Sequence, residues 1–125
     1  MPTEAEFQVI CLCADWCGTC REYRQVFDAV GRSFPSMHFR WLDIEDDAEA
    51  VGDLDIENFP TLLIGRGGDV LYFGTMLPHS GHLQRLLGVF AGQSPAASRD
   101  YAVSSPELRA WQGDEDLRRL CRGKE

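Results

Sequence analysis

The feature that most constrains the fold is a short segment, residues 7–20, in which an apolar run leads into two closely spaced cysteines. Residues 7–13 (FQVICLC) are nearly all apolar over the length of a strand, which is typical of a central strand covered on both faces. Beyond Cys20, apolar side chains recur at spacings of three and four, as on one face of a helix: Tyr23, Phe27, Val30 and Phe34. The segment therefore predicts a buried strand followed directly by an amphipathic helix.

Two cysteines lie at the start of this predicted helix. Unpaired backbone N–H groups and the positive end of the helix dipole should stabilise the thiolate of Cys17, and a thiolate is the form that attacks disulfides. Cys20 lies one turn further on, on the same side, where its sulfur can close a ring with Cys17. We expect Cys17 to attack a disulfide and Cys20 to resolve the mixed disulfide that results.

The motifs and their order resemble the thioredoxin family. Residues 16–20 (WCGTC) follow the apolar strand, residues 58–62 (NFPTL) precede a second apolar run, and Gly74 follows the next hairpin. The resemblance extends over about residues 7–92. It implies a thioredoxin-like fold in which Pro60 follows a cis peptide bond and lies against the active-site sulfurs.

The resemblance also implies an activity: reduction or exchange of protein disulfides through the Cys17–Cys20 dithiol. The substrate should bind as an extended strand. Its contacts are expected at Trp16, Gly18, Thr19, Phe59, Pro60, Gly74 and Thr75. Electrons would come from a flavoprotein like thioredoxin reductase, and no bound organic cofactor is needed.

The chain departs from the family at several positions near the cysteines. Cys11 stands where thioredoxins typically carry a buried aspartate, and Trp41 stands where they carry its lysine partner. Cys13 replaces a family tryptophan and leaves more room near the site. We expect Cys11, rather than Cys13, to lie beneath the CxxC pair. It is either a small buried apolar residue or an accessory redox thiol that can pair with Cys20.

The remaining periodicity predicts an α/β domain of order β-α-β-α-β-β-α. Its mixed four-stranded sheet is flanked by helices, and it lacks the usual first β-α unit, since only residues 1–6 precede the first strand. A β-α-β crossover of this kind should be right-handed. The strands are predicted at 7–13, 37–43, 61–65 and 70–73, and later helices at 46–54 and 83–90.

We assign residues 1–92 to the thioredoxin-like domain and residues 93–125 to a linker and a short helical C-terminal extension. Residues 93–98 have linker composition. Ser105 followed by Pro106 predicts a helix start, and residues 113–114 a break before a second short helix. We expect these two helices to dock on the sheet edge that the missing first unit leaves open.

Charge and hydropathy exclude two classes of function. The net charge is −8, and no Lys or Arg occurs between Arg40 and Arg66, so binding to nucleic acid is not expected. The acidic run at residues 43–57 is either a solvated surface or a steering surface for a basic partner.

No apolar run approaches the ~20 residues of a membrane span. Since residues 1–6 carry no leader pattern, we expect a cytoplasmic protein.

Two other classes of function remain open. One is a non-catalytic interaction or assembly protein that uses the fold as a peptide-binding scaffold. The other is a metal-binding module with ligands drawn from Cys11, Cys13, Cys17 and Cys20.

The three histidines are expected at the surface or at helix ends, and Cys121 is either packed or a target for oxidation. These histidines are His38, His79 and His82.

Overall fold

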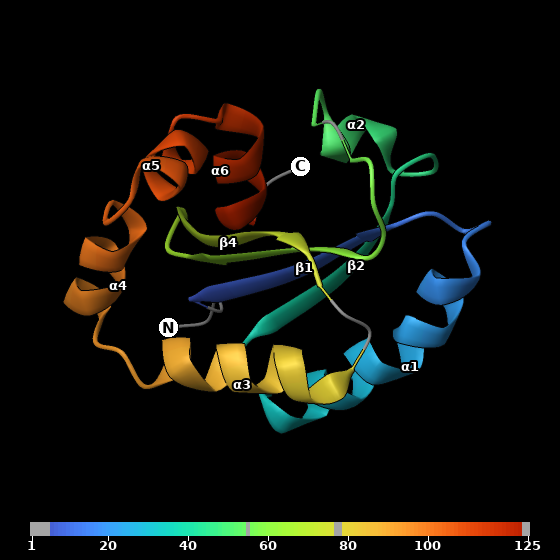
Figure 1. Cartoon of the computed structure of the whole chain (residues 1–125), viewed down its shortest axis with the longest axis horizontal. Coiled ribbons are helices and arrows are strands. Elements are labelled where there is room, and N and C mark those ends of the chain that lie inside the picture. The colour runs from blue at the N-terminus through green and yellow to red at the C-terminus, as the bar shows by residue number, and fades with distance from the viewer. Residues whose placement is uncertain (1–5, 55, 77–78, 124–125) are drawn as a thin grey trace.

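The structure, a computed structural model, describes residues 6–54, 56–76 and 79–123. Figure 1 shows its sheet lying between two layers of helices. The strands are β1 (Phe7–Cys13), β2 (His38–Asp43), β3 (Thr61–Arg66) and β4 (Asp69–Thr75). The helices are α1 (Gly18–Ser33), α2 (Ala48–Val51), α3 (Ser80–Ala91), α4 (Pro95–Ala102), α5 (Pro106–Gln112) and α6 (Glu115–Cys121).

The sheet confirms the predicted mixed, four-stranded arrangement, with the strand order β2-β1-β3-β4. β1 runs parallel to β2 and antiparallel to β3, and β3 forms a hairpin with β4. Every residue of β1 is buried, because helices cover both of its faces. Val9 and Cys11 belong to the core on one face, and Ile10 and Leu12 to the core on the other.

The first core lies between the sheet and the helices α1 and α3. The predicted stripe of α1 is largely confirmed: Tyr23, Phe27 and Val30 are buried, while Phe34 is partly buried against them just after the helix ends. From α3, three apolar side chains complete this core: Leu83, Leu87 and Phe90. The helix that carries the cysteines is therefore fixed to the sheet along most of its length.

The second core lies on the opposite face, under α2, α5 and α6. Leu117, Leu120 and Cys121 of α6 pack on apolar side chains of the sheet, among them Leu63. Gly65 of β3 permits this approach, because a Cβ atom built there would collide with the side chain of Cys121. The C-terminal residues thus form an integral layer of the fold.

Two helices differ from the predictions. α2 is shorter than predicted, because Gly52 adopts a φ of 69°, a conformation that favours glycine and ends the helix. α4 begins inside the segment predicted as a linker, so residues 93–123 of the tail hold three helices where two were expected. Ser94 caps α4 by accepting a hydrogen bond from the backbone N–H of Ala97, with Pro95 in the first turn. Ser105 caps α5 in the same way, as predicted.

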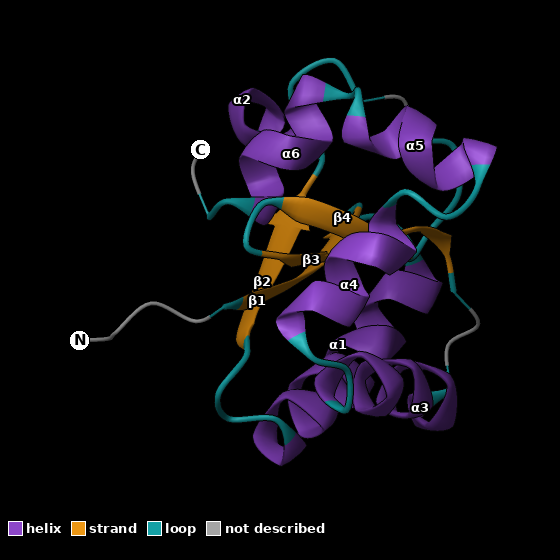
Figure 2. Cartoon of the chain, turned by 90° about the vertical axis from the view of Figure 1, so that its left-hand side faces the viewer, coloured by secondary structure: helices purple, strands orange, loops and turns teal. Residues whose placement is uncertain are grey.

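The expected docking place of the tail is wrong. β2 is the edge strand that the family's additional unit would have covered, but the tail packs on the face of the sheet and along the opposite edge strand, β4. In Figure 2, α4 lies on this side of the molecule, between the two helical layers. Gln112 donates to the carbonyl of Val70 (2.7 Å) and accepts from its N–H (2.9 Å), so its amide replaces a neighbouring strand. The tail goes there because the apolar face of β1, β3 and β4 would otherwise be exposed to water.

Candidate active site

The loop between β1 and α1 places Cys17 at the N-terminus of the helix, as the sequence predicted. Cys17 is the N-cap residue, with extended backbone angles (φ −87°, ψ 120°), and α1 begins at Gly18. The backbone N–H of Cys17 donates to the carbonyl of Ala14 (3.0 Å), which closes the turn that leaves β1. No side chain caps the first turn of α1 at this residue, so the free N–H groups there remain available to a thiolate.

Cys20 is bonded to Cys13, not to the Cys17 that the CxxC motif predicted. The structure contains a disulfide between Cys13 and Cys20, whose Cα atoms lie 5.8 Å apart, and Cys17 is a free, partly exposed thiol. Cys13 and Cys20 are each only 1% exposed. The expected Cys17–Cys20 disulfide is therefore not the one formed in this state of the molecule.

Cys11 lies beside Cys13 and is not bonded to Cys20. Its sulfur is 3.6 Å from that of Cys13, and the disulfide-bonded Cys13 has no S–H, so Cys11 is the donor. Burial raises the pKa of the Cys11 thiol far above its usual range, against a smaller opposing effect of Arg24. The expectation that Cys11, rather than Cys13, lies beneath Cys20 is wrong: Cys13 is the nearer residue.

A signal for this pairing was present in the sequence. Residues two apart on a strand point to the same face, so Cys11 and Cys13 had to share the face that α1 covers. Cys13 is the last residue of β1, nearest to the start of the helix. A small side chain at that position leaves room for the sulfur of Cys20, which is why this pair meets.

An aromatic wall stands beside the cysteines. Trp16 is 61% exposed and lies edge-on to Phe59, with ring centroids 5.5 Å apart. The peptide bond between Phe59 and Pro60 is cis, as the resemblance implied. The indole N–H of Trp16 donates to the carboxylate of Glu45 (3.4 Å). The structure thus brings residues from three distant parts of the chain to one surface.

The second loop of the expected substrate surface lies beside Pro60. Thr61 pairs with Thr75 across the hairpin, and the backbone N–H of Met76 donates to the carbonyl of Pro60 (3.2 Å). Gly74 and Thr75 line a cavity of about 190 Å³ together with residues of the segment before Pro60. Gly18 and Thr19 lie in the first turn of α1, and a Cβ atom added at Gly18 would meet open space.

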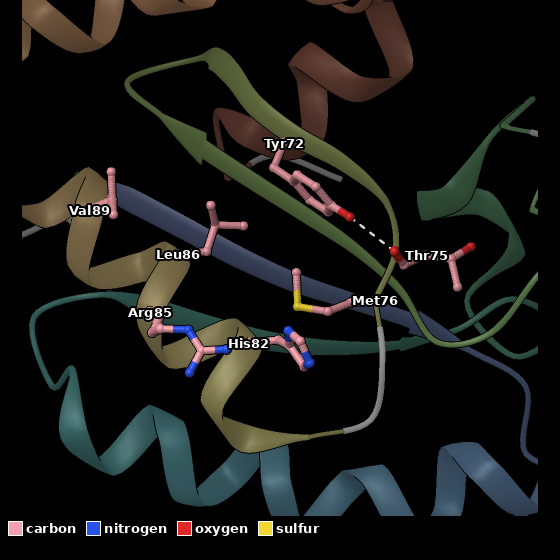
Figure 3. A pocket seen from close by; sticks show the side chains of 7 residues that line it. All are labelled: Tyr72, Thr75, Met76, His82, Arg85, Leu86 and Val89. Atoms are coloured by element: carbon pink, nitrogen blue, oxygen red, sulfur yellow. Dashed lines mark hydrogen bonds between the residues drawn. The ribbon is translucent and has the colours of Figure 1, made fainter.

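A larger cavity of about 400 Å³ continues from Thr75 along α3 (Figure 3). In Figure 3 the side chains of Met76 and His82 point into it from opposite sides. The hydroxyl of Tyr72 donates to the carbonyl of Thr75 (2.9 Å), which fixes the end of β4 at the mouth of the cavity. The cavity is lined by both polar and apolar side chains, with Leu86 and Met76 beside Tyr72 and His82.

The start of the acidic run folds against the site. The carboxylate of Asp43 accepts hydrogen bonds from the backbone N–H groups of Glu45 (2.8 Å) and Asp46 (3.0 Å). These bonds, that from Asp46 foremost, hold the pKa of Asp43 below its ordinary value. Asp47 accepts from the backbone N–H of Asp43 (2.9 Å). Two of the acidic residues therefore hold the loop in shape, and Glu45 contacts the aromatic wall.

A small cavity of about 170 Å³ lies next to Cys20, on the side of Trp41 and Arg24. It is lined by Asp15, Arg21, Arg24 and Trp41. The guanidinium of Arg24 stacks over the ring of Trp41, 4.8 Å from its centroid. Trp41 thus packs an apolar ring, rather than the family's lysine, against the core beside the cysteines.

The remaining predicted groups lie away from this centre. His38 pairs with the side chain of Gln8 (2.9 Å), and the rings of His79 and His82 contact each other beside the start of α3. Cys121 is buried in the second core, which raises its pKa to about 12.

In residues 6–54, 56–76 and 79–123, no three His, Cys, Asp or Glu side chains are placed to hold a metal ion. None of the helices described there has the length and apolar character needed to cross a membrane.

Part of the sequence is shared with known proteins. Residues 2–78 match the family model "Thioredoxin". Thioredoxin H2-1 of rice (Oryza sativa subsp. japonica) is 33% identical over 61 residues, which cover 49% of this chain and 44% of that protein. A thioredoxin H-type protein of Picea mariana is 31% identical over 55 residues, 44% of each chain. The chain spans less than half of the length of the relatives it matches.

Solved structures show the same fold. The crystal structure of thioredoxin from Trypanosoma brucei brucei superposes with a TM-score of 0.63 at 24% identity, covering 72% of this chain and 79% of that one. At this level of identity the likeness concerns the fold. It confirms the thioredoxin-like arrangement of a mixed sheet flanked by helices.

Proposed function

Because this chain belongs to the thioredoxin family, we propose that it is a thiol–disulfide oxidoreductase that acts on protein disulfides. The observation that carries the proposal is the position of Cys17. It is a free, partly exposed thiol at the N-terminus of α1, beside an aromatic wall and a cis proline. A sulfur so placed faces the unpaired backbone N–H groups of the first helical turn and has an open side from which a substrate can approach.

In the proposed reaction, the reduced protein begins with free thiols at Cys17 and Cys20. The thiolate of Cys17 attacks one sulfur of the substrate disulfide, and the other substrate sulfur leaves as a thiolate. Cys20 then attacks the sulfur of Cys17, which releases the second substrate thiol and leaves a Cys17–Cys20 disulfide. Cys20 lies within the first turn of α1, so it approaches Cys17 from the protein side while the substrate lies outside.

We propose that the substrate lies across the surface formed by Trp16, Phe59 and Pro60 on one side and Gly74 and Thr75 on the other. Gly18 and Thr19 border the same surface. We propose that the bound segment is an extended peptide that lies across this surface. The exposed ring of Trp16 would shield the mixed disulfide from water.

The partners follow from the same chemistry. The oxidised protein must receive two electrons before the next cycle, and we propose a flavoprotein like thioredoxin reductase as their source. The protein itself then needs no bound organic cofactor. We place this cycle in the cytoplasm, where the redox balance keeps thiols such as Cys17 and Cys121 reduced.

The test uses insulin as the disulfide substrate and dithiothreitol as the electron source. We expect Cys17→Ala to lose the catalysed reduction of insulin entirely. We expect Cys20→Ala to accumulate a mixed disulfide with insulin through Cys17, because the resolving thiol is missing. Cys121→Ala, a buried cysteine in the other core, is the matched control and should reduce insulin as the unmodified chain does. Full activity of Cys17→Ala would overturn the proposal.

A second candidate, a scaffold for protein assembly, is favoured by one observation: Cys20 is already bonded to Cys13 and so is not free to resolve a mixed disulfide. The scaffold hypothesis predicts that the double variant Cys17→Ala/Cys20→Ala still binds its partner with unchanged affinity. The oxidoreductase proposal predicts that covalent capture of the partner is lost in that variant.

A further inference from the structure

The sulfurs of Cys11, Cys13 and Cys20 lie together at the end of β1 and the start of α1, and Cys13 and Cys20 are bonded. Cys17 packs against the same core. We propose that Cys13 is a second resolving thiol, which moves the disulfide from Cys17–Cys20 to Cys13–Cys20 and leaves Cys17 free. This inference rests on the proposed function, because it starts from the Cys17–Cys20 disulfide that the proposed cycle forms. It adds a state in which the chain is oxidised yet still carries its exposed thiol.

The step is a thiol–disulfide exchange within the chain. Cys13 gives its proton to water, and its thiolate attacks the sulfur of Cys20. The Cys17–Cys20 bond breaks, the Cys13–Cys20 bond forms, and Cys17 leaves with the electron pair as a thiolate. The chain is oxidised by two electrons before and after the exchange, so no further oxidant or reductant takes part.

The geometry allows this exchange without a rearrangement of the fold. Cys13 and Cys20 have Cα atoms 5.8 Å apart, within the range that a disulfide spans, and both belong to the core under α1. Cys20 is a member of both disulfides, so only the sulfur of Cys17 is displaced. Cys17 sits at the N-cap, from which its side chain can turn towards solvent.

The surroundings favour the product. A disulfide carries no charge, so the apolar core holds the Cys13–Cys20 bond without a desolvation cost, and both residues are only 1% exposed there. The displaced Cys17 thiolate remains beside the free N–H groups of the first turn of α1. In the starting state these positions are reversed: the exposed position carries the neutral disulfide, and the core holds the ionisable thiol.

Cys11 assists the buried sulfur. Its S–H donates to the sulfur of Cys13 across 3.6 Å. Because burial keeps Cys11 protonated, it can still donate to Cys13 while Cys13 carries negative charge during the attack. Cys11 is therefore a positioning residue in this step, and Cys13 is the thiol that reacts.

The consequence is a change in what the exposed thiol does. With Cys20 held by Cys13, a mixed disulfide formed at Cys17 has no resolving thiol within reach. The oxidised chain then captures a protein disulfide covalently and holds it, whereas the reduced chain releases its product. The expected ligand of this state is a protein with an accessible disulfide.

The test determines which cysteines are bonded to each other. Two cleavage sites in the sequence place the relevant cysteines on separate peptides. Cleavage before Asp15 and after Arg21 separates residues 1–14, with Cys11 and Cys13, from residues 15–21, with Cys17 and Cys20. The reduced full-length chain is oxidised with one equivalent of diamide, its free thiols are alkylated at low pH, and the digest is weighed by mass spectrometry. A Cys13–Cys20 bond links the two peptides, while a Cys17–Cys20 bond closes peptide 15–21 on itself.

We expect the linked peptides, alkylated at Cys17, to be the main product at equilibrium, and the closed peptide to appear first and decay. In Cys13→Ala the closed peptide should persist. In Cys11→Ala, which removes the hydrogen-bond donor and leaves Cys13 in place, the linked peptides should still form, but more slowly. Mixed with insulin, the equilibrated oxidised chain should hold a mixed disulfide at Cys17.

Two results would overturn this inference alone, and a third would overturn the proposed function with it. If the closed peptide persists in the unmodified chain, Cys13 does not exchange, and only this inference fails. The same holds if linked peptides form without any closed precursor. If neither the unmodified chain nor Cys13→Ala ever forms the closed peptide, the Cys17–Cys20 cycle itself fails. The mapping of the unmodified chain decides the question even if a variant does not fold.

Discussion

At the scale of the residue, reactivity in this chain follows from where each sulfur meets solvent. Cys17 lies at a helix N-terminus and is partly exposed, whereas Cys11 is fully buried and its pKa is raised by burial. Cys13 and Cys20 form a bond in the core. We therefore propose that Cys17 is the nucleophile, while Cys11 acts as a hydrogen-bond donor and Cys13 and Cys20 exchange their bond within the core.

A carboxylate near the site is expected to make stability depend on pH. The folded-state pKa of Asp43 is lowered, so its contribution is fully present above its unfolded value near 3.8 and is lost as the pH falls through the folded value. We expect Asp43→Ala to reduce the free energy of unfolding by about 1 kcal/mol at pH 7, as the loss of a helix-cap-type carboxylate does. This difference should shrink as the pH falls through the lowered pKa of Asp43.

Urea unfolding at pH 7 and at low pH measures this effect. Asp46→Ala is the control, since it removes an exposed carboxylate and keeps the backbone N–H that Asp43 binds. An Asp43→Ala cost that stays the same at both pH values would contradict the assignment.

At the scale of the element, a single side chain attaches the tail to the sheet. The amide of Gln112 donates to the carbonyls of Val70, Ala102 and Leu108, and it accepts from the N–H of Val70. It therefore fastens α5 to the edge of β4 and to the end of α4. An edge strand covered in this way is protected from pairing with another chain.

Replacing this side chain should have a clear cost. We expect Gln112→Ala to lower the free energy of unfolding by about 1–3 kcal/mol, because it leaves buried backbone groups of Val70 without partners. Amide hydrogen exchange at Val70 should accelerate. Glu107→Ala, on the exposed side of the same helix, should change neither quantity. Unchanged exchange at Val70 in Gln112→Ala would show that α5 does not hold this edge.

The elements show what sequence could predict and what it could not. The strand–helix unit around Cys17 was predicted, because apolar periodicity and the cysteine spacing are local signals. Ser94 and Pro95 carry the same start signal as Ser105 and Pro106, but small polar neighbours gave that segment linker composition. The docking on β4 and the Cys13–Cys20 bond depend on which distant groups meet, and local patterns carry no record of that.

At the scale of the whole molecule, two helical layers make one unit with the sheet between them. We propose residues 1–92 as the thioredoxin-like part and residues 93–125 as an extension that completes its second core. The extension covers Ile10, Leu12 and Leu63, which would otherwise be exposed on the face of the sheet opposite α1. The layer beneath the cysteines and the layer added by the tail thus share the central strand β1.

Whether the tail and the rest of the domain unfold together can be tested at Leu120, which is fully buried in the second core. We expect Leu120→Ala to lower the free energy of unfolding by about 2–5 kcal/mol, since it removes apolar contacts and leaves a cavity. Val103→Ala, an exposed apolar residue in the same region, should cost under about 0.5 kcal/mol. A single unfolding transition in both, followed by circular dichroism, is expected. A separate early transition in Leu120→Ala would show that the tail folds independently.

The most direct test of the central claim is an equilibrium titration of the whole chain against glutathione, with thiols trapped by alkylation and counted. The account predicts one two-electron transition, in which the free thiols fall from five to three. A midpoint near the thioredoxin value of about −270 mV would mark a reductase, and one nearer about −200 mV a glutathione-linked role. If all five thiols remain free until the glutathione is fully oxidised, the chain has no redox-active pair, and the oxidoreductase account is contradicted.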